Sequence, residues 1–125
     1  MLDLQHALEY LQGDRLLLQQ MLKLFTHTLA QLQAELKIAH CKLNVQINDS
    51  EWKTFYRTLH AAKPVLLIIG NPTIRKIVPE LCEALVTENQ LKTLELAPLL
   101  GEFLQKMALE ITLQNDAAEM PASSG

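Results

Sequence analysis

The sequence has little of what builds turns, cross-links or strands. Four glycines and two cysteines occur among 125 residues, and aromatic residues make up only 5%. Cys41 and Cys82 form no C-x-x-C pair, so neither a disulfide framework nor a zinc site is expected. The chain is instead rich in Leu, Ala, Glu, Lys and Gln, which lose little rotamer freedom in a helix. An all-α fold is therefore predicted.

Long apolar runs and clusters of basic residues are also missing. The longest uninterrupted apolar run, Val65 to Ile69, is too short to cross a bilayer, and no basic-then-apolar signal opens the chain. The eleven basic residues are scattered among fourteen acidic ones, for a formal net charge of -3. Neither a membrane nor a nucleic acid is therefore expected as a partner. A cytoplasmic protein is predicted, and Met1 with the polar tail favours a short independent one.

Apolar residues supply enough material for one core. They make up 49% of a chain whose 125 residues have the size of a single domain. They recur at three- and four-residue steps in five successive stretches, which predicts amphipathic helices packed as an antiparallel bundle. These helices are predicted over residues 2–12, about 14–40, 50–70, 72–86 and 91–114. Residues 41–49 are interpreted as a connection, and a domain over 1–114 is followed by a disordered tail over 115–125.

Turn and capping residues mark several helix ends. Gly13 suits the left-handed conformation that ends the first helix, and Asp14 is a good N-cap for the second. Gly70-Asn71-Pro72 ends the third helix and starts the fourth with proline in its first turn. Bends are expected at the interior prolines Pro79 and Pro98.

The run Pro64 to Gly70 is locally ambiguous, since a continuous β-branched stretch after a proline also suits a buried strand. A helix is preferred because no other segment alternates polar and apolar residues, so a strand would have no pairing partner. In the last helix, the apolar positions include Leu91, Leu94, Leu100, Phe103, Leu104, Met107 and Ile111.

One of the four histidines stands out by its surroundings. His6, His27 and His40 are interpreted as ordinary surface or boundary histidines. His60 lies beside the apolar stripe of the third helix, at the shoulder of the buried face. That stripe, expected to point inward, consists of Trp52, Phe55, Tyr56, Leu59 and Ala62. No residue grouping has the spacing of a metal site, and no nucleotide-binding or G-x-S-x-G motif occurs.

The sequence around His60 has a recognisable order. Residues 50–63 read SEWKTFYRTLHAAK, and a glycine at position 70 precedes spaced apolar residues at Ile74, Ile77, Val78 and Leu81. This order resembles the histidine-containing phosphotransfer (HPt) family, whose core pattern is His-x-x-Lys-Gly followed by small residues. LQGD at 11–14 and the spaced leucines after it look like the family's first two helices, so the resemblance covers residues 2 to about 114. It implies an antiparallel four-helix bundle with a short additional N-terminal helix.

The resemblance also implies a phosphorelay function. His60, exposed midway along the third helix, would accept a phosphoryl group from a receiver-domain aspartate and pass it to another receiver. The chain would be a phosphoryl carrier and no enzyme of its own, with receiver domains and a sensor or hybrid histidine kinase as partners. It would need no cofactor, because Mg²⁺ is expected on the partner receiver domain. A monomer is expected.

The residues near His60 suit this chemistry. A neutral imidazole is a good nucleophile near pH 7 and needs no dedicated base. Lys63 lies one turn away, where its ammonium could neutralise part of a phosphoryl charge. The rim that a receiver helix would contact is predicted to consist of Arg57, Ala61, Pro64, Leu67 and Ile68.

The chain departs from the family pattern directly after the lysine. Pro64 stands where the family has glycine, and Leu67 and Ile68 replace small residues. Proline cannot donate a hydrogen bond to the carbonyl of His60, so a kink is expected there. Three interpretations stay open: a phosphorelay carrier, a degenerate adaptor that binds a kinase or receiver without being phosphorylated, and a helical protein in which His60 is merely a boundary histidine.

Overall fold

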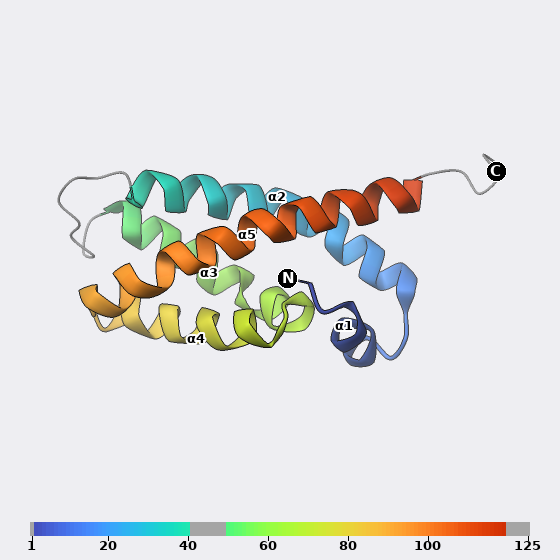
Figure 1. The fold of residues 1–125 in the computed structure, drawn as a ribbon, viewed down its shortest axis with the longest axis horizontal. Helices are drawn as coiled ribbons and strands as arrows, with labels where there is room; N and C mark the ends of the chain where they lie inside the picture. The colour runs from blue at the N-terminus through green and yellow to red at the C-terminus, as the bar shows by residue number, and fades with distance from the viewer. Residues whose placement is uncertain (1, 41–49, 120–125) are drawn as a thin grey trace.

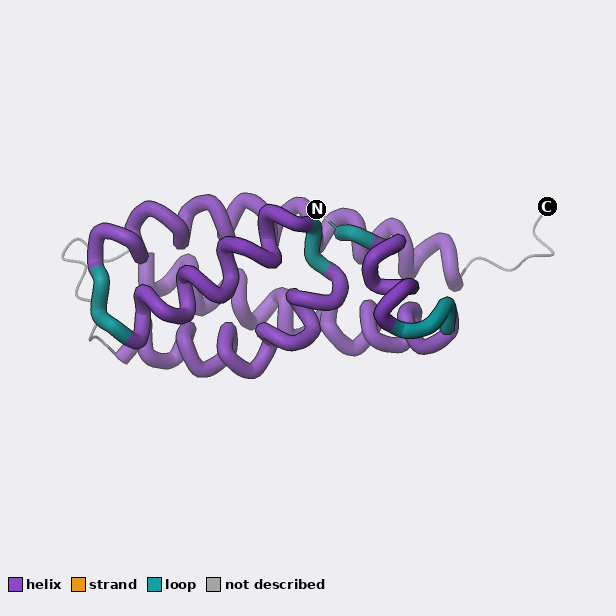
Figure 2. Tube along the Cα trace, turned by 90° about the horizontal axis from the view of Figure 1, so that it is seen from below, coloured by secondary structure: helices purple, strands orange, loops and turns teal. Residues whose placement is uncertain are grey.

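The protein is built from helices. A computed structural model describes residues 2–40 and 50–119, with no side-chain description for residues 40 and 115–119. Within these ranges the helices are α1 (Leu4–Tyr10), α2 (Arg15–His40), α3 (Ser50–Ile69), α4 (Pro72–Val86) and α5 (Gln90–Glu119). Figure 2 shows that short loops join them wherever the connection is described. The all-α prediction is confirmed, and none of the described helices is long and apolar enough to cross a membrane.

The four longer helices pack in a ring of neighbours. α2 contacts α3 and α5, and α4 contacts the same two helices from the other side. The short α1 packs against α2 and α3 (Figure 1). Every long helix therefore has two long neighbours, and its apolar stripe faces the space that they share.

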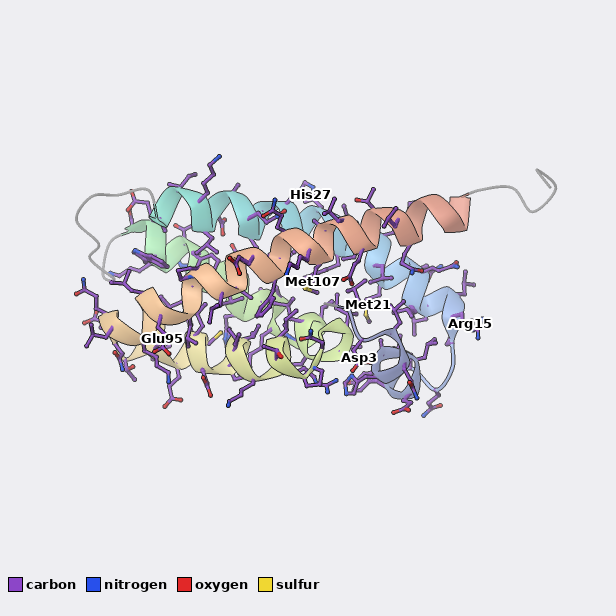
Figure 3. The ribbon with its side chains drawn as sticks, in the orientation of Figure 1. Asp3, Arg15, Met21, His27, Glu95 and Met107 are labelled. Atoms are coloured by element: carbon purple, nitrogen blue, oxygen red, sulfur yellow. The ribbon has the colours of Figure 1, made fainter. Side chains whose placement is uncertain are left out.

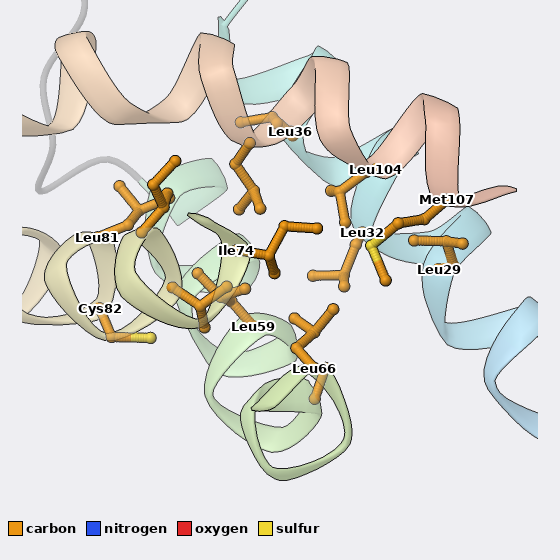
Figure 4. Close-up of a cluster of buried hydrophobic side chains, with 14 of the residues drawn as sticks. Leu29, Leu32, Leu36, Leu59, Leu66, Ile74, Leu81, Cys82, Leu104 and Met107 are labelled. Atoms are coloured by element: carbon orange, nitrogen blue, oxygen red, sulfur yellow. The ribbon is translucent and has the colours of Figure 1, made fainter. Parts of the chain in front are cut away.

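That shared space is filled by aliphatic side chains. In Figure 4, Leu32 of α2, Leu59 and Leu66 of α3, and Met107 of α5 converge on the centre, together with residues of α4. The predicted apolar stripes of the second and fourth helices are buried, except that Met21 of the α2 stripe is half-buried. Their buried members are Leu18, Leu22, Phe25, Leu29, Leu32 and Leu36 in α2, and Ile74, Ile77, Val78, Leu81 and Leu85 in α4.

The predicted end signals are confirmed in part: α1 ends at Tyr10, two residues earlier than predicted, and Gln12, with a φ of +57°, precedes Gly13 in the left-handed conformation. Gly13 has a φ of +80°, and the Asp14 carboxylate accepts a hydrogen bond from the Leu17 N–H at 2.9 Å. Asn71 is the N-cap of α4, where its side chain accepts from the Ile74 N–H at 2.9 Å, and Pro72 follows in the first turn.

The ambiguous run after Pro64 is helical, as preferred from the sequence. α3 continues through Pro64 to Ile69, and Gly70 ends it with a single antiparallel bridge to Leu2. A Cβ at Gly70 would lie 2.6 Å from the Leu66 carbonyl oxygen and 2.7 Å from Cγ2 of Ile74. Only glycine fits this junction, because α3 and α4 approach each other too closely for a side chain.

The N-terminal segment closes this same end of α3. The Asp3 N–H donates to the carbonyl of Ile69 at 2.8 Å, and Nδ1 of His6 lies 3.0 Å from the carbonyl oxygen of Ile68. The helical donor for Ile68 would be the N–H of residue 72, but that residue is proline. His6 is therefore a half-buried capping residue, a role that sequence reasoning missed.

Side chains fasten the segment to two further helices. The Asp3 carboxylate caps α1 through the His6 N–H and lies 3.4 Å from the Arg75 guanidinium of α4. The Leu2 N–H donates to the Glu110 carboxylate of α5 at 2.7 Å. Burial raises the pKa of the Glu110 carboxyl, but hydrogen bonds, including this one, outweigh it and the net pKa is lowered.

The start and end of α5 differ from the prediction. Leu91, predicted as a core-facing position, is 83% exposed, while Leu96 and Ala97 are buried. Thr93 is fully buried as well, and its hydroxyl has no hydrogen-bond partner among the described residues. The error arose because periodicity cannot fix the phase of a helix whose first turn mixes polar and apolar residues.

The last helix extends beyond its predicted end at residue 114. α5 runs without interruption through Pro98 to Glu119, so residues 115–119 continue a helix instead of starting a disordered tail. A helix anchored upstream extends more easily than it nucleates, which a count of apolar residues does not reveal. The predicted connection over 41–49 and the rest of the tail, 120–125, lie outside the described residues.

Candidate functional site

His60 lies on the solvent side of α3, midway along the helix. The core-facing residues of this helix are Trp52, Phe55, Leu59, Ala62, Leu66 and Ile69. His60 follows Leu59 by one residue, which turns it about 100° away from that fully buried leucine. Its side chain is exposed, as predicted. The helix therefore presents an imidazole on a backbone that is fixed by the core.

The imidazole has a specific aromatic neighbour. The rings of Tyr56 and His60 are stacked, with centroids 5.6 Å apart and planes at 26°. The two residues are four apart on α3 and so share one edge of the helix. Tyr56 was predicted to point fully inward, but it is half-buried, because it lies at the border of the stripe.

Lys63 lies on the side of α3 that faces α4. It is half-buried, and its charge acts on the thiol of Cys82 in α4. Burial raises the pKa of the Cys82 thiol above its ordinary value of 9.0, and the Lys63 ammonium lowers it only in part. The cation predicted to assist His60 therefore lies on the α4 side of α3, one turn from the imidazole.

The residues predicted as a docking rim differ in exposure. Arg57, Ala61 and Pro64 are exposed around His60, while Leu67 and Ile68 are half-buried, and Ile68 packs against the core. Because Pro64 has no N–H, it cannot donate to the His60 carbonyl in the usual helical manner, although α3 continues on both sides. The face nearest His60 is thus formed mainly by short or rigid side chains and one arginine.

A groove between α2 and α3 borders this face. Sequence reasoning missed it, because it depends on how the two helices pack. Polar side chains from both helices surround an apolar floor, and Arg57 and Ala61 belong both to the groove and to the rim around His60. The lining residues are Phe25, Thr28 and Gln31 from α2 and Arg57, Thr58, Ala61, Ala62 and Val65 from α3.

The chemistry available here is that of a nucleophile with a nearby cation. Among residues 2–40 and 50–119, no three His, Cys, Asp or Glu side chains gather as metal ligands. Cys82 is a free thiol, but it is only 5% exposed. His60 is the exposed group in this region that can form a covalent bond to an electrophile near neutral pH.

Comparisons of the chain with protein-family models, with curated proteins and with solved structures found no match.

Proposed function

We propose that the protein is a histidine phosphotransfer protein, in which His60 accepts a phosphoryl group from a receiver-domain aspartate and passes it to another receiver. The observation that carries this proposal is the exposure of His60 on a helix whose opposite face is anchored in the core. A carrier needs an accessible nitrogen held at a fixed position, so that two different partners can approach it in turn.

The transfer step balances without a base. A ring nitrogen of neutral His60 attacks phosphorus, the bond from phosphorus to the aspartyl oxygen breaks, and the aspartate leaves with the electron pair as a carboxylate. The imidazole ring becomes cationic while it carries the phosphoryl group. Lys63 supports the step because a cation one turn away stabilises the negative phosphoryl oxygens. The Mg²⁺ implied by the resemblance to the HPt family belongs to the partner receiver.

The helix arrangement supports an HPt-like antiparallel four-helix bundle. Successive long helices double back along one another in Figure 1, and the ring of contacts closes from α5 to α2. The short α1 packs outside this ring against α2 and α3. In such a bundle, the middle of α3 is a convex outer surface on which a partner can dock.

A receiver would meet His60 on the α2 side of α3. Arg57 and Ala61 connect the imidazole to the groove that Thr28 and Gln31 border, so one docking helix can engage both. Such contacts are usually modest in area and transient. The protein would act as a cytoplasmic monomer that carries phosphoryl groups between receivers and performs no independent catalysis.

Leu67 favours a second candidate function. It lies almost in line with His60 along the helix and is half-exposed, so it adds apolar bulk where the family has a small residue. If that bulk keeps the phosphoaspartate away from the imidazole, the protein is an adaptor that binds a kinase or receiver without carrying phosphate.

The test is phosphoryl transfer from receiver domains charged with radiolabelled acetyl phosphate. The relay predicts a label on the wild type that acid removes and alkali does not, a label on His27→Ala, and none on His60→Ala. Lys63→Gln is expected to accept label about two- to fivefold more slowly, the effect of one partly exposed charge.

The outcomes separate the candidates. Binding of the receiver without label on the wild type supports the adaptor, while equal labelling of His60→Ala contradicts the relay. Leu67→Ala refines the adaptor outcome, because label that appears only in this variant identifies Leu67 as the obstruction.

A further inference from the structure

The partner of the His60 ring is anchored. Tyr56 is half-buried and packs against the core, whereas His60 is exposed. Their centroids are 5.6 Å apart and their planes are 26° from parallel. The phenol ring therefore stacks, with an offset, on one face of an imidazole whose residue is exposed to solvent.

We infer that Tyr56 is a positioning residue for phosphoryl transfer, which orients the His60 ring and stabilises the positive charge that the ring gains when its nitrogen bonds to phosphorus. This inference rests on the proposed function. Tyr56 touches neither donor nor phosphoryl group, so it acts only through His60.

The charge-stabilising role of Tyr56 follows from the change in charge of the His60 ring during phosphoryl transfer. A neutral imidazole becomes a cation as the nitrogen–phosphorus bond forms, and the face of an aromatic ring attracts a cation within about 6 Å of its centroid. The separation of the two rings is inside that limit. The attraction is stronger in the transition state than in the ground state, so it accelerates the step.

The orienting role of Tyr56 follows from the rotational freedom of the His60 side chain. An exposed histidine samples several rotamers, and only some direct a nitrogen outward. Stacking on a ring that the core holds in place favours those in which the edge points to solvent. Fewer unproductive orientations mean a larger fraction of the protein ready to react.

The experiment uses phosphoramidate, a small donor that needs no partner protein. Its nitrogen–phosphorus bond breaks, ammonia leaves with the electron pair, and the phosphoryl group bonds to His60. Labelling is followed by ³¹P NMR in the full chain for wild type, Tyr56→Phe and Tyr56→Leu, with Tyr10→Leu as the matched control. Tyr10 is 64% exposed and belongs to α1, a different helix from the one that carries His60.

Tyr56→Leu is expected to label about two- to fivefold more slowly, the range of an exposed cation–aromatic contact. The loss should appear in the rate at saturating phosphoramidate and leave the half-saturating concentration unchanged. Tyr56→Phe keeps the aromatic face and should retain the wild-type rate, as should Tyr10→Leu. In proton NMR, the His60 ring protons should lie upfield in wild type and Tyr56→Phe and move downfield in Tyr56→Leu.

Each failure has its own signature. If wild type and Tyr56→Leu label His60 equally fast, the role of Tyr56 is wrong and the relay stands. If His60 takes no label although its ring protons lie upfield, the stack exists but both the relay and the positioning role are wrong. Far-ultraviolet circular dichroism of the same samples shows whether a slow variant has simply lost its helices, and labelling of exposed His27 shows that the donor is equally active in each sample.

Discussion

Two histidines, His60 of α3 and His6 of α1, lie in contrasting places on α3. His6 is half-buried at the C-terminal end of the helix, where its Nδ1 lies 3.0 Å from the Ile68 carbonyl. His60 is exposed midway along it and contacts the face of Tyr56. One imidazole satisfies a backbone group that proline leaves without a donor, and the other is exposed on the surface of the helix. The environment, and not the residue type, separates a structural from a reactive histidine.

The backbone around the two histidines differs as well: it is tightly packed near His6 and exposed near His60. At the end of α3, Gly70 leaves no room for a methyl group, and Asp3 joins the helix to α1 and α4. In the middle, Pro64 removes a hydrogen bond from the exposed backbone beside His60. The end of α3 is closed by packing, and the middle is open to a partner.

The largest effect on stability is expected from Gly70→Ala. Its Cβ would meet the Leu66 carbonyl at 2.6 Å, and backbone cannot move aside as a side chain can. The free energy of unfolding should fall by about 3 kcal/mol, the upper range for overpacking. Urea unfolding measures this loss. Gly101→Ala is the control, because its Cβ would meet only the flexible Leu36 side chain at 3.3 Å, so it should change stability by less than about 1 kcal/mol.

Pro64→Ala should act in the opposite direction. Alanine restores a donor for the His60 carbonyl and removes a ring that crowds it, so unfolding should require about 1 to 3 kcal/mol more. Urea unfolding also tests this gain. A loss of stability in Pro64→Ala would mean that the proline makes contacts that the helix depends on, and that the middle of α3 is not the open region described above.

A smaller loss is expected from Asp3→Ala. This change removes the N-cap of α1 and a partly exposed ion pair with Arg75. Together these should lower the free energy of unfolding by about 1 to 2 kcal/mol. Asp3→Asn keeps the capping oxygen and loses only the charge, so it should cost about 0.5 kcal/mol or less. If both variants lose the same free energy of unfolding, the ion pair with Arg75, and not the N-cap, is the stabilising interaction of Asp3.

The smallest effect concerns pH and Cys82. Burial raises the pKa of this thiol in the folded protein, so the unfolded chain ionises first as the pH rises. The contribution to stability is complete below the ordinary pKa of about 9 and is lost as the pH rises through the folded value. The difference in unfolding free energy between wild type and Cys82→Ala should therefore narrow from pH 7.5 to pH 10. A difference that stays constant would contradict a raised pKa.

The sequence predicted the buried faces of the helices correctly where the apolar periodicity was regular. α2 and α4 carry regular apolar stripes with Asp14 and Asn71 at their starts, and both stripes are buried as predicted except for the half-buried Met21. Leu91 was placed on the wrong face because the first turn of α5 has no clear phase. Thr93 is buried without a hydroxyl partner among the described residues, which no polarity rule predicts.

The candidate site was predictable only in part. The offset of His60 from its stripe placed it at the shoulder of the buried face, since that is a property of one helix, and the resemblance to the HPt family implied its exposure. The capping of Ile68 by His6 joins residues 62 positions apart, and the effect of Lys63 on Cys82 joins two helices. Contacts between elements depend on the packed fold, so a pattern along the chain does not reveal them.

The most direct test compares the histidines within one molecule. The wild-type chain is treated with phosphoramidate for a short time. It is then cleaved into peptides at alkaline pH, where the phosphohistidine label persists, and mass spectrometry locates the phosphoryl group. Figure 3 shows His27 on the outer side of α2, so it reports the rate of an ordinary exposed histidine. The account predicts that His60 is labelled first, before His27 and well before His6. Labelling of His27 or His6 ahead of His60 would contradict it.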